Sequence, residues 1–143
     1  MNALYPAICA HDVPTSRDFY ARLFGLDIVF DSGWYVQLVD RANPTAQIGI
    51  IEQGHATVPD GYQGVPAGVL VSIEVDDATA LHEHAVESGL QIAMTLRDED
   101  FGQRHFMTVD PDGLLVDVIE LTPMRGEFAD SGLNGAHGVV VDR

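Results

Sequence analysis

Two side chains that can exchange protons, His105 and Asp117, stand on either side of a turn sequence. A carboxylate in the middle of an apolar strand is costly to bury unless a metal ion, a cation or water lies beside it. His105 and Asp117 fall on adjacent predicted strands, where together they would form an acid/base pair. Three other interpretations stay open: a hydrogen-bonded pair that only satisfies the acid, an ion pair with Arg104, or a remodelled metal site.

A predicted β-hairpin positions these two residues. Residues 102–121 form two β-runs joined by Asp110-Pro111-Asp112-Gly113. Proline presets φ for a turn, aspartate side chains bond nearby backbone N–H groups, and glycine tolerates positive φ. Alternation along the second run places Asp117 on one face together with Leu115 and Ile119.

The remaining elements predict a duplicated unit. A strand, a helix that begins at Asp12 or Thr15 and ends at Gly25, and three strands are followed by the same order of elements. The expected strands lie at 4–10, 27–31, 34–39, 46–52, 69–75, 91–95 and in the hairpin, and the second helix begins at Asp76-Asp77 and ends at Gly89.

The predicted fold class is therefore α+β, with two tandem βαβββ units forming a curved mixed sheet with a central cleft and helices on the outside. We expect a single domain over residues 1–143. Its parts are unit one (1–53), a linker (54–68), unit two (69–121) and a C-terminal tail (122–143).

Composition restricts the class of protein. The chain has 143 residues, 22 acidic and seven basic, for a net charge of −15. That charge repels nucleic acid and attracts cations. The sequence has no apolar run long enough for a membrane span and no leader pattern, so we expect a cytoplasmic protein without nucleic-acid or membrane partners. One cysteine excludes an internal disulfide and a Cys-rich zinc site.

The motifs resemble the vicinal oxygen chelate superfamily, which includes glyoxalase I, extradiol dioxygenases, fosfomycin-modifying enzymes and bleomycin resistance proteins. The resemblance covers about residues 4–121. It rests on the paired βαβββ units, on the opening Asp12-Val13-Pro14-Thr15-Ser16-Arg17-Asp18-Phe19-Tyr20 with Phe24-Gly25-Leu26, and on the ending Asp110-Pro111-Asp112-Gly113 with Asp117.

This resemblance implies four positions for the ligands of a divalent metal ion: Tyr5, Gly49, Leu70 and Asp117. Glycine and leucine cannot ligate, a neutral tyrosine is a poor ligand, and one carboxylate cannot replace several protein ligands. We therefore predict that the usual metal site is absent and that the protein uses no cofactor.

If Asp117 and Gly49 face the cleft, alternation selects its other lining residues, whereas Phe30 and Trp34 are predicted to lie in the core. A register slip of one residue would exchange the two faces. The predicted ligand-binding residues are Tyr5, Tyr35, Gln37, Gln47, Leu70, Ser72, Phe101, His105, Met107 and Asp117.

Residues 101–113 look most like the bleomycin-resistance-type branch, whose members sequester a cationic, aromatic antibiotic without chemistry at a dimer interface. This resemblance implies a homodimeric small-molecule binding protein that takes a hydrophobic or cationic ligand without a metal and acts in antibiotic resistance. The alternative is a metal-dependent lyase or dioxygenase with a reduced or relocated metal site, for which His105 and Asp117 are the catalytic candidates. A third possibility is a scaffold with a vestigial cleft.

Overall fold

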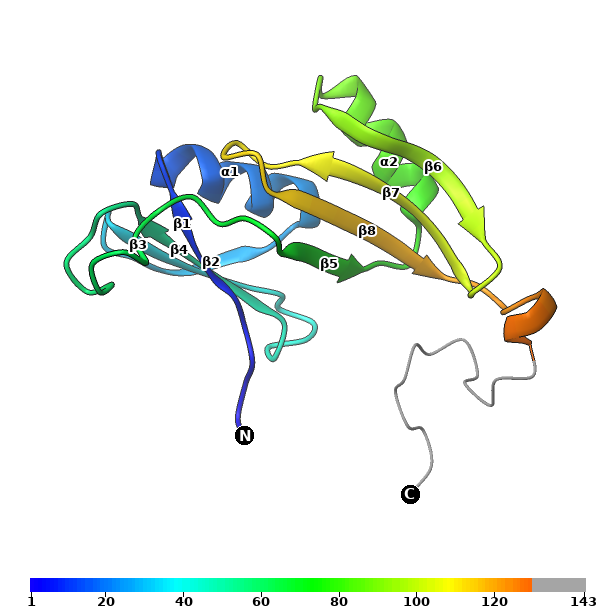
Figure 1. Cartoon of the computed structure of the whole chain (residues 1–143), viewed down its shortest axis with the longest axis horizontal. Coiled ribbons are helices and arrows are strands. Elements are labelled where there is room, and N and C mark those ends of the chain that lie inside the picture. The colour runs from blue at the N-terminus through cyan, green and yellow to red at the C-terminus, as the bar shows by residue number, and fades with distance from the viewer. Residues whose placement is uncertain (130–143) are drawn as a thin grey trace. The chain divides into compact units, whose positions relative to one another are not determined.

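A computed structural model describes residues 1–129, and both predicted βαβββ repeats are present in it (Figure 1). The first repeat consists of β1 (Ala7–Ala10), α1 (Val13–Phe24), β2 (Asp27–Asp31), β3 (Tyr35–Val39) and β4 (Gln47–Glu52). The second consists of β5 (Leu70–Glu74), α2 (Ala78–Glu87), β6 (Ile92–Glu99), β7 (Gln103–Val109) and β8 (Leu115–Leu121), followed by a 3-10 helix at Gly126–Phe128. The α+β class is confirmed; the part of the predicted tail from residue 130 on lies outside the described residues.

Each repeat forms its own four-stranded mixed sheet. The strand orders are β1-β4-β3-β2 and β5-β8-β7-β6, so the two sheets have the same topology. In each sheet the first strand pairs in parallel with the last one, and the other neighbours are antiparallel. One helix crosses over between the first and second strands of each repeat, and it packs on the strands of its own sheet.

The two helices begin and end where their capping residues predict. Asp12 accepts a hydrogen bond from the backbone N–H of Thr15 at 3.0 Å, and Asp77 accepts one from Ala80 at 2.8 Å. These carboxylates satisfy N–H groups that have no partner within the helix. Gly25 ends α1 in the left-handed region, with φ of 65°.

Burial alternates along the strands and identifies the face of each sheet that its helix covers. In β3, Val36 and Leu38 have no exposed surface, while the residues between them are half-buried. In β7, Phe106 is fully buried, as the alternation predicts, and its ring lies edge-on to His82 of α2. The opposite face of each sheet carries the polar side chains that the sequence assigned to the cleft.

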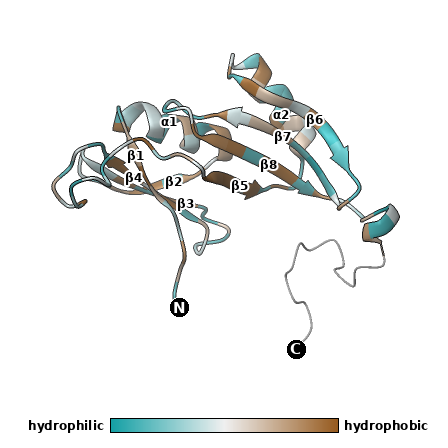
Figure 2. Cartoon of the chain, viewed as in Figure 1, coloured by the Kyte–Doolittle hydropathy of each residue, from teal (hydrophilic) through white to brown (hydrophobic). Residues whose placement is uncertain are grey.

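Strands β1, β3 and β6 differ from their predicted extents in ways that bear on the site, and β4 and β5 are shorter by one residue at one or both ends. Strand β1 begins at Ala7, because Pro6 has no N–H to add to the ladder. Strand β3 begins at Tyr35 and excludes Trp34. Strand β6 continues to Glu99 rather than ending at Thr95, and its charged end is coloured as hydrophilic in Figure 2.

The described chain falls into two compact units, and the first of them includes a short segment from the second repeat. The first contains residues 1–69 together with Asp110–Leu114, and the second contains Leu70–Val109 and the residues from Leu115 on. The turn between β7 and β8 therefore packs with the first repeat. No helix among residues 1–129 combines the length and the apolar content of a membrane span.

Asp110 organises this turn. It is 5% exposed, and its carboxylate accepts hydrogen bonds from the backbone N–H groups of Asp112 and Leu114, both at 2.9 Å. The hydroxyl of Tyr20 in α1 donates to the same carboxylate at 2.9 Å. Burial, followed by the charge of Asp110, raises the pKa of Tyr20. Helix α1 and the turn are thus joined through a buried charge that three donors satisfy.

Asp112 adds a second connection at the start of α1. Its carboxylate accepts from the backbone N–H of His11 at 2.9 Å and from the hydroxyl of Ser16 at 3.1 Å. Both aspartates of the predicted turn motif therefore bind α1 or the residue before its N-cap.

We predict that Tyr20→Phe lowers the free energy of unfolding by about 1.5–3 kcal/mol, because it removes a buried hydrogen bond to a charged acceptor. The measurement is the urea midpoint at neutral pH. Tyr62→Phe is the control, because Tyr62 is 78% exposed and its substitution should change stability by less than about 0.5 kcal/mol. Equal midpoints for the two variants would contradict the role given to Tyr20.

Candidate functional site

A chain of hydrogen bonds runs across the open face of the first sheet. The hydroxyl of Tyr35 donates to Oε1 of Gln37, and Nε2 of Gln37 donates to Oε1 of Gln47 at 2.7 Å. Nε2 of Gln47 then donates to the carbonyl oxygen of Pro44, also at 2.7 Å. Three residues that the sequence assigned to ligand binding are thus brought together, on β3 and β4.

The missing side chain of Gly49 makes room for this arrangement. Gly49 pairs with Gln37 on one side and with Ala7 on the other. A Cβ at position 49 would lie 2.6 Å from the hydroxyl oxygen of Tyr35 and 3.3 Å from the Cβ of Ala7. The hydroxyl of Tyr35 therefore fills the space that a side chain at position 49 would need.

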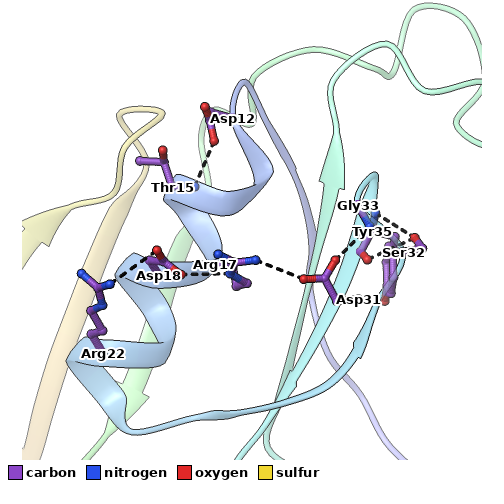
Figure 3. A network of polar contacts seen from close by, with 9 residues as sticks. All are labelled: Asp12, Thr15, Arg17, Asp18, Arg22, Asp31, Ser32, Gly33 and Tyr35. Atoms are coloured by element: carbon purple, nitrogen blue, oxygen red, sulfur yellow. Dashed lines mark hydrogen bonds and ion pairs between the residues drawn. The ribbon is translucent and has the colours of Figure 1, made fainter.

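Helix α1 and the β2–β3 turn hold Tyr35 in place (Figure 3). Arg17 donates to Asp31 at 3.1 Å, and Asp31 accepts from the backbone N–H of Gly33 at 2.8 Å. Ser32 closes the turn, because its backbone N–H donates to the carbonyl oxygen of Tyr35 at 3.0 Å. The bond from Gly33, followed by that from Arg17, lowers the pKa of Asp31, so the carboxylate stays charged and keeps both contacts.

Tyr5 lies next to Tyr35 and modifies its acidity. Burial is the main reason why the pKa of Tyr35 is raised, and the charge interaction and hydrogen bond with Tyr5 raise it further. Tyr5 is 42% exposed, so it is the outer member of the pair. The hydroxyl of Tyr35 is therefore neutral at physiological pH.

Four aromatic rings follow one another beside this chain, and only that of Tyr35 was predicted to be there. Phe30 pairs with Gln37 across the strands, and its ring centre lies 6.2 Å from that of Tyr35. The ring of Trp34 lies 5.9 Å from Tyr35 and stacks on His55 at 3.9 Å with an angle of 4° between the planes.

The prediction that Phe30 and Trp34 belong to the core is wrong. Phe30 is 54% exposed and Trp34 is 37% exposed. The register of β2 shifts between Ile28 and Phe30, which changes the face that Phe30 occupies relative to simple alternation. Trp34 lies in the turn, where strand alternation does not apply. We call Phe30, Trp34, Tyr35 and His55 the aromatic row.

The second unit brings His105 and Asp117 together, as the sequence predicts. Nδ1 of His105 lies 2.9 Å from Oδ1 of Asp117, and both residues are buried. Strand register accounts for the contact, since Asp117 pairs with Met107 and His105 pairs with Ile119, so the two side chains are diagonal neighbours on one face.

Glu99 is a third member of this cluster, which sequence reasoning missed. Its Oε1 lies 3.2 Å from Nε2 of His105 and also accepts from Nε of Arg97. The predicted strand ends at Thr95, so Glu99 falls outside it, whereas β6 extends to Glu99. The charged repeat Arg97-Asp98-Glu99 was the available signal, because alternation puts Arg97 and Glu99 on one face of a longer strand.

This geometry changes the chemistry expected of His105. Each of its nitrogens lies within hydrogen-bond distance of a carboxylate, and a neutral imidazole donates from only one nitrogen. Both contacts are hydrogen bonds only when the ring is doubly protonated. Neither nitrogen is free to take a proton from a bound substrate, so the arrangement favours satisfaction of the buried acid over acid/base catalysis.

The suggested ion pair between Arg104 and Asp117 is wrong. Arg104 binds Asp98 through two hydrogen bonds, of 2.7 and 3.1 Å. Alternation places Arg104 on the face of β7 opposite to His105. The hydrogen bond from Arg104 lowers the pKa of Asp98, in agreement with a stable pair of charges.

The other predicted site residues of the second unit lie around this cluster. Ser72 pairs with Asp117 across β5 and β8, and Leu70 pairs with Leu115. Both are exposed, and Met107 is half-buried. Phe101, in the turn after β6, lies edge-on to His105 with 6.3 Å between ring centres and edge-on to Phe128 at 6.0 Å.

The residues at the four family positions do not fit a divalent metal ion. In the first unit, Gly49 offers no donor, and the hydroxyl of Tyr35 occupies the space beside it. In the second, Leu70 is aliphatic, and Asp117 is hydrogen-bonded to His105. Within residues 1–129, no three or more His, Cys, Asp or Glu side chains are grouped so that they could hold a metal ion.

We predict that Gly49→Ala destabilises the protein by about 1–3 kcal/mol, because the new methyl group meets the hydroxyl of Tyr35. The same change in a Tyr35→Phe background should cost less, since the oxygen is gone and the nearest ring carbon lies at 3.2 Å. Urea denaturation of the four proteins measures this coupling. Gly64→Ala is the control, because a Cβ there meets nothing within 4 Å. Additive costs would contradict the close approach.

We predict that Glu99→Gln lowers the melting temperature at pH 7 by a few degrees. Hydrogen bonds from His105 and then Arg97 hold the pKa of Glu99 below its ordinary value of 4.5. This stabilisation is present above pH 4.5 and is lost as the pH falls through the lower folded value. The difference between Glu99→Gln and wild type should therefore narrow below pH 4.5. Glu83→Gln, at an exposed helix position, is the control. A difference that does not change with pH would overturn this account.

Comparison with known proteins agrees with the fold. The family model of the Glyoxalase/Bleomycin resistance protein/Dioxygenase superfamily matches residues 3–118. No curated protein matches the chain.

Among solved structures, three similar ones are TioX from Micromonospora sp. ML1, a superfamily member from Sphaerobacter thermophilus and a lactoylglutathione lyase from Agrobacterium tumefaciens. TioX is 17% identical with a TM-score of 0.69, over 85% of this chain and 99% of TioX. The Sphaerobacter protein is 22% identical with a TM-score of 0.68, over 84% and 97%. The lyase is 18% identical with a TM-score of 0.64, over 84% and 94%.

The similar structures support the fold alone. The family model carries more weight, because it matches residues 3–118 of the sequence. Together with the duplicated βαβββ topology, it means that the chain belongs to the Glyoxalase/Bleomycin resistance protein/Dioxygenase superfamily.

Proposed function

We propose that this protein binds a small aromatic, cationic molecule without a metal ion and acts by sequestering it. The observation that carries the proposal is the aromatic row on the open face of the first sheet. Phe30 and Trp34 are exposed there although both are large and apolar, and they lie beside the polar chain of Tyr35, Gln37 and Gln47.

An aromatic row of this kind favours a planar ligand. Stacked and edge-on ring pairs stabilise a contact by about 0.5–1.5 kcal/mol beyond the effect of the buried area. Trp34 already stacks face to face on His55, so its plane is held in position before a ligand arrives. Apolar rings with a few placed polar groups beside them are the composition typical of small-molecule sites.

The charge of the chain favours a cation. A net charge of −15 raises the local concentration of cations and their rate of encounter. Cations also bind the faces of tryptophan and tyrosine rings, with an energy of about 0.5–2 kcal/mol. Trp34 and Tyr35 supply such faces in the first unit.

The metal-dependent lyase or dioxygenase is the weaker candidate. Gly49 and Leu70 supply no donor at two of the four family positions, and both nitrogens of His105 are engaged by carboxylates. The similar lactoylglutathione lyase does not favour it, because a neighbour that is 18% identical supports the fold alone.

The test is isothermal titration calorimetry, in which the purified protein is titrated with the aromatic cation (2-naphthylmethyl)trimethylammonium. We expect saturable binding that excess EDTA does not change. Trp34→Ala should weaken the binding about tenfold, because it removes a stacking and cation–π surface. Tyr62→Ala, which removes an exposed aromatic residue outside the aromatic row, should leave the binding unchanged.

Two results would overturn the proposal. One is the absence of saturable binding; the other is a stoichiometric metal ion in the purified protein whose removal abolishes binding.

Three finer expectations stay predictions: the homodimer, the cytoplasmic location and a role in antibiotic resistance. Each follows from the resemblance to the bleomycin-resistance-type branch or from composition, and gel filtration, cell fractionation and a resistance assay test them in turn.

A further inference from the structure

His55 covers one face of Trp34 in the aromatic row. The two rings are parallel to within 4°, and their centres are 3.9 Å apart. Trp34 is 37% exposed, so the indole keeps accessible surface beside this contact. The ring of Tyr35, 5.9 Å from Trp34, carries a neutral hydroxyl. A ligand that lies on the indole therefore comes close to the imidazole of His55, and the charge of that imidazole acts on it.

The loop after β4 holds His55 in this position. The backbone carbonyl oxygen of His55 accepts hydrogen bonds from the backbone N–H of Val58 at 3.0 Å and from Nε2 of Gln63 at 3.2 Å. Nε2 of Gln63 also donates to the carbonyl oxygen of Val58 at 2.7 Å. On the other side of the stack, the carbonyl oxygen of Trp34 accepts from the backbone N–H of Glu52 at 2.8 Å. Backbone contacts thus fix both members of the ring pair.

The neutral form of His55 has a defined tautomer. The backbone N–H of Thr57 donates to Nδ1 at 3.3 Å, so this nitrogen carries a lone pair and the ring proton is on Nε2. A second proton can therefore be added only at Nδ1. The hydroxyl oxygen of Thr57 lies 3.0 Å from Nδ1 and can accept from it, because a hydroxyl both donates and accepts. His55 can thus become charged without leaving its place on Trp34.

We propose that protonation of His55 weakens the binding of cationic ligands to the aromatic row, so that the site binds its ligand at neutral or alkaline pH and releases it in acid. The inference rests on the proposed function, and it adds a regulation of the same site. The imidazolium places a positive charge on the tryptophan face that otherwise attracts a cation. Two like charges a few ångströms apart repel each other, so the proton and the ligand compete.

The segments beside His55 also carry acidic groups. Glu52 lies at the end of β4, and its carbonyl oxygen accepts from the backbone N–H of His55 at 3.2 Å. Asp60 follows His55 in the same loop, and Asp31, at the end of β2, is bound by Arg17. Aspartate and glutamate ordinarily titrate below about pH 5, whereas histidine ordinarily titrates between about pH 5 and pH 8. A change in binding between pH 8 and pH 5.5 is therefore assigned to histidine.

The experiment is isothermal titration calorimetry at pH 8 and pH 5.5 with two probes. One is (2-naphthylmethyl)trimethylammonium, whose charge does not depend on pH, and the other is the neutral 2-naphthalenemethanol. We expect the affinity of wild type for the cation to fall about three- to tenfold on acidification, the effect of one like charge near a protein surface. The affinity for the neutral probe should change by less than about twofold, since it carries no charge to be repelled.

Two variants separate His55 from the general loss of negative charge, because all six histidines become more positive on acidification. His55→Phe keeps a ring on Trp34 but cannot be protonated, so most of the pH dependence should disappear. His84→Gln is the matched control, since His84 is exposed on α2, and it should keep the pH dependence of wild type. Trp34 is the only tryptophan in the sequence, so its fluorescence without ligand should change between the two pH values in wild type and not in His55→Phe.

The outcomes separate this inference from the proposed function. If the cation binds with the same affinity at both pH values, the inference is wrong while the proposed function stands. An equal loss of affinity for the neutral probe, or a pH dependence that remains in full in His55→Phe, also overturns the inference. If His55→Phe does not fold, His55→Gln takes its place, because it also removes the titrating ring. Failure of the cation to bind at either pH overturns both.

Discussion

The buried carboxylate of Asp110 connects the β7–β8 turn to helix α1. A charge that is 5% exposed would be costly, and three donors compensate for it: two backbone N–H groups of its own turn and the hydroxyl of Tyr20. The same turn fixes the pairing of Val109 with Leu115, and a slip of one residue there would move every side chain of β8 to the other face. The position of Asp117 beside His105 therefore depends on how Asp110 is satisfied. So does the packing of α1, which in turn holds the β2–β3 turn through Arg17 and Asp31.

The two side-chain hydrogen-bond networks, one in each unit, differ in whether they contain charged groups. In the second unit, His105 lies between Asp117 and Glu99, and Arg97 binds Glu99 from outside, so every polar group of the cluster has a partner within it. In the first unit, the chain from Tyr35 through Gln37 and Gln47 to Pro44 consists of neutral groups only. A closed charge network favours a structural role, because opening it leaves a buried charge without a partner. A network of neutral groups carries no such cost.

Much of the fold could be predicted because the signals are local. Asp12 and Asp77 mark helix starts, Gly25 marks a helix end, and the Asp110–Gly113 turn sets a hairpin. Alternation also assigned Tyr35, Gln37 and Gln47 to one face, and the observed hydrogen bonds join these three side chains there. The failures occur where regular alternation stops. The register shift in β2 exposes Phe30, the turn exposes Trp34, and the charged extension of β6 brings Glu99 to His105. Of these three features, only the extension of β6 left a signal in the sequence, the alternating charges of Arg97-Asp98-Glu99.

The side chain absent at position 49 and the position of Tyr35 are linked by volume rather than by charge. Glycine at position 49 is destabilising within a strand, since it has no side chain to pack and more backbone entropy to lose. Here the phenol of Tyr35 occupies the free volume, which compensates in part for the missing side chain and places a neutral hydroxyl on the open face. Placing a metal-ligating side chain at position 49 would require more than one substitution. Tyr35 would first have to move, and the hydrogen bonds of Gln37 and Gln47 would have to be replaced. The surface around position 49 is therefore a locally stable alternative to a metal site, held by mutual packing, and not a metal site that lacks one residue.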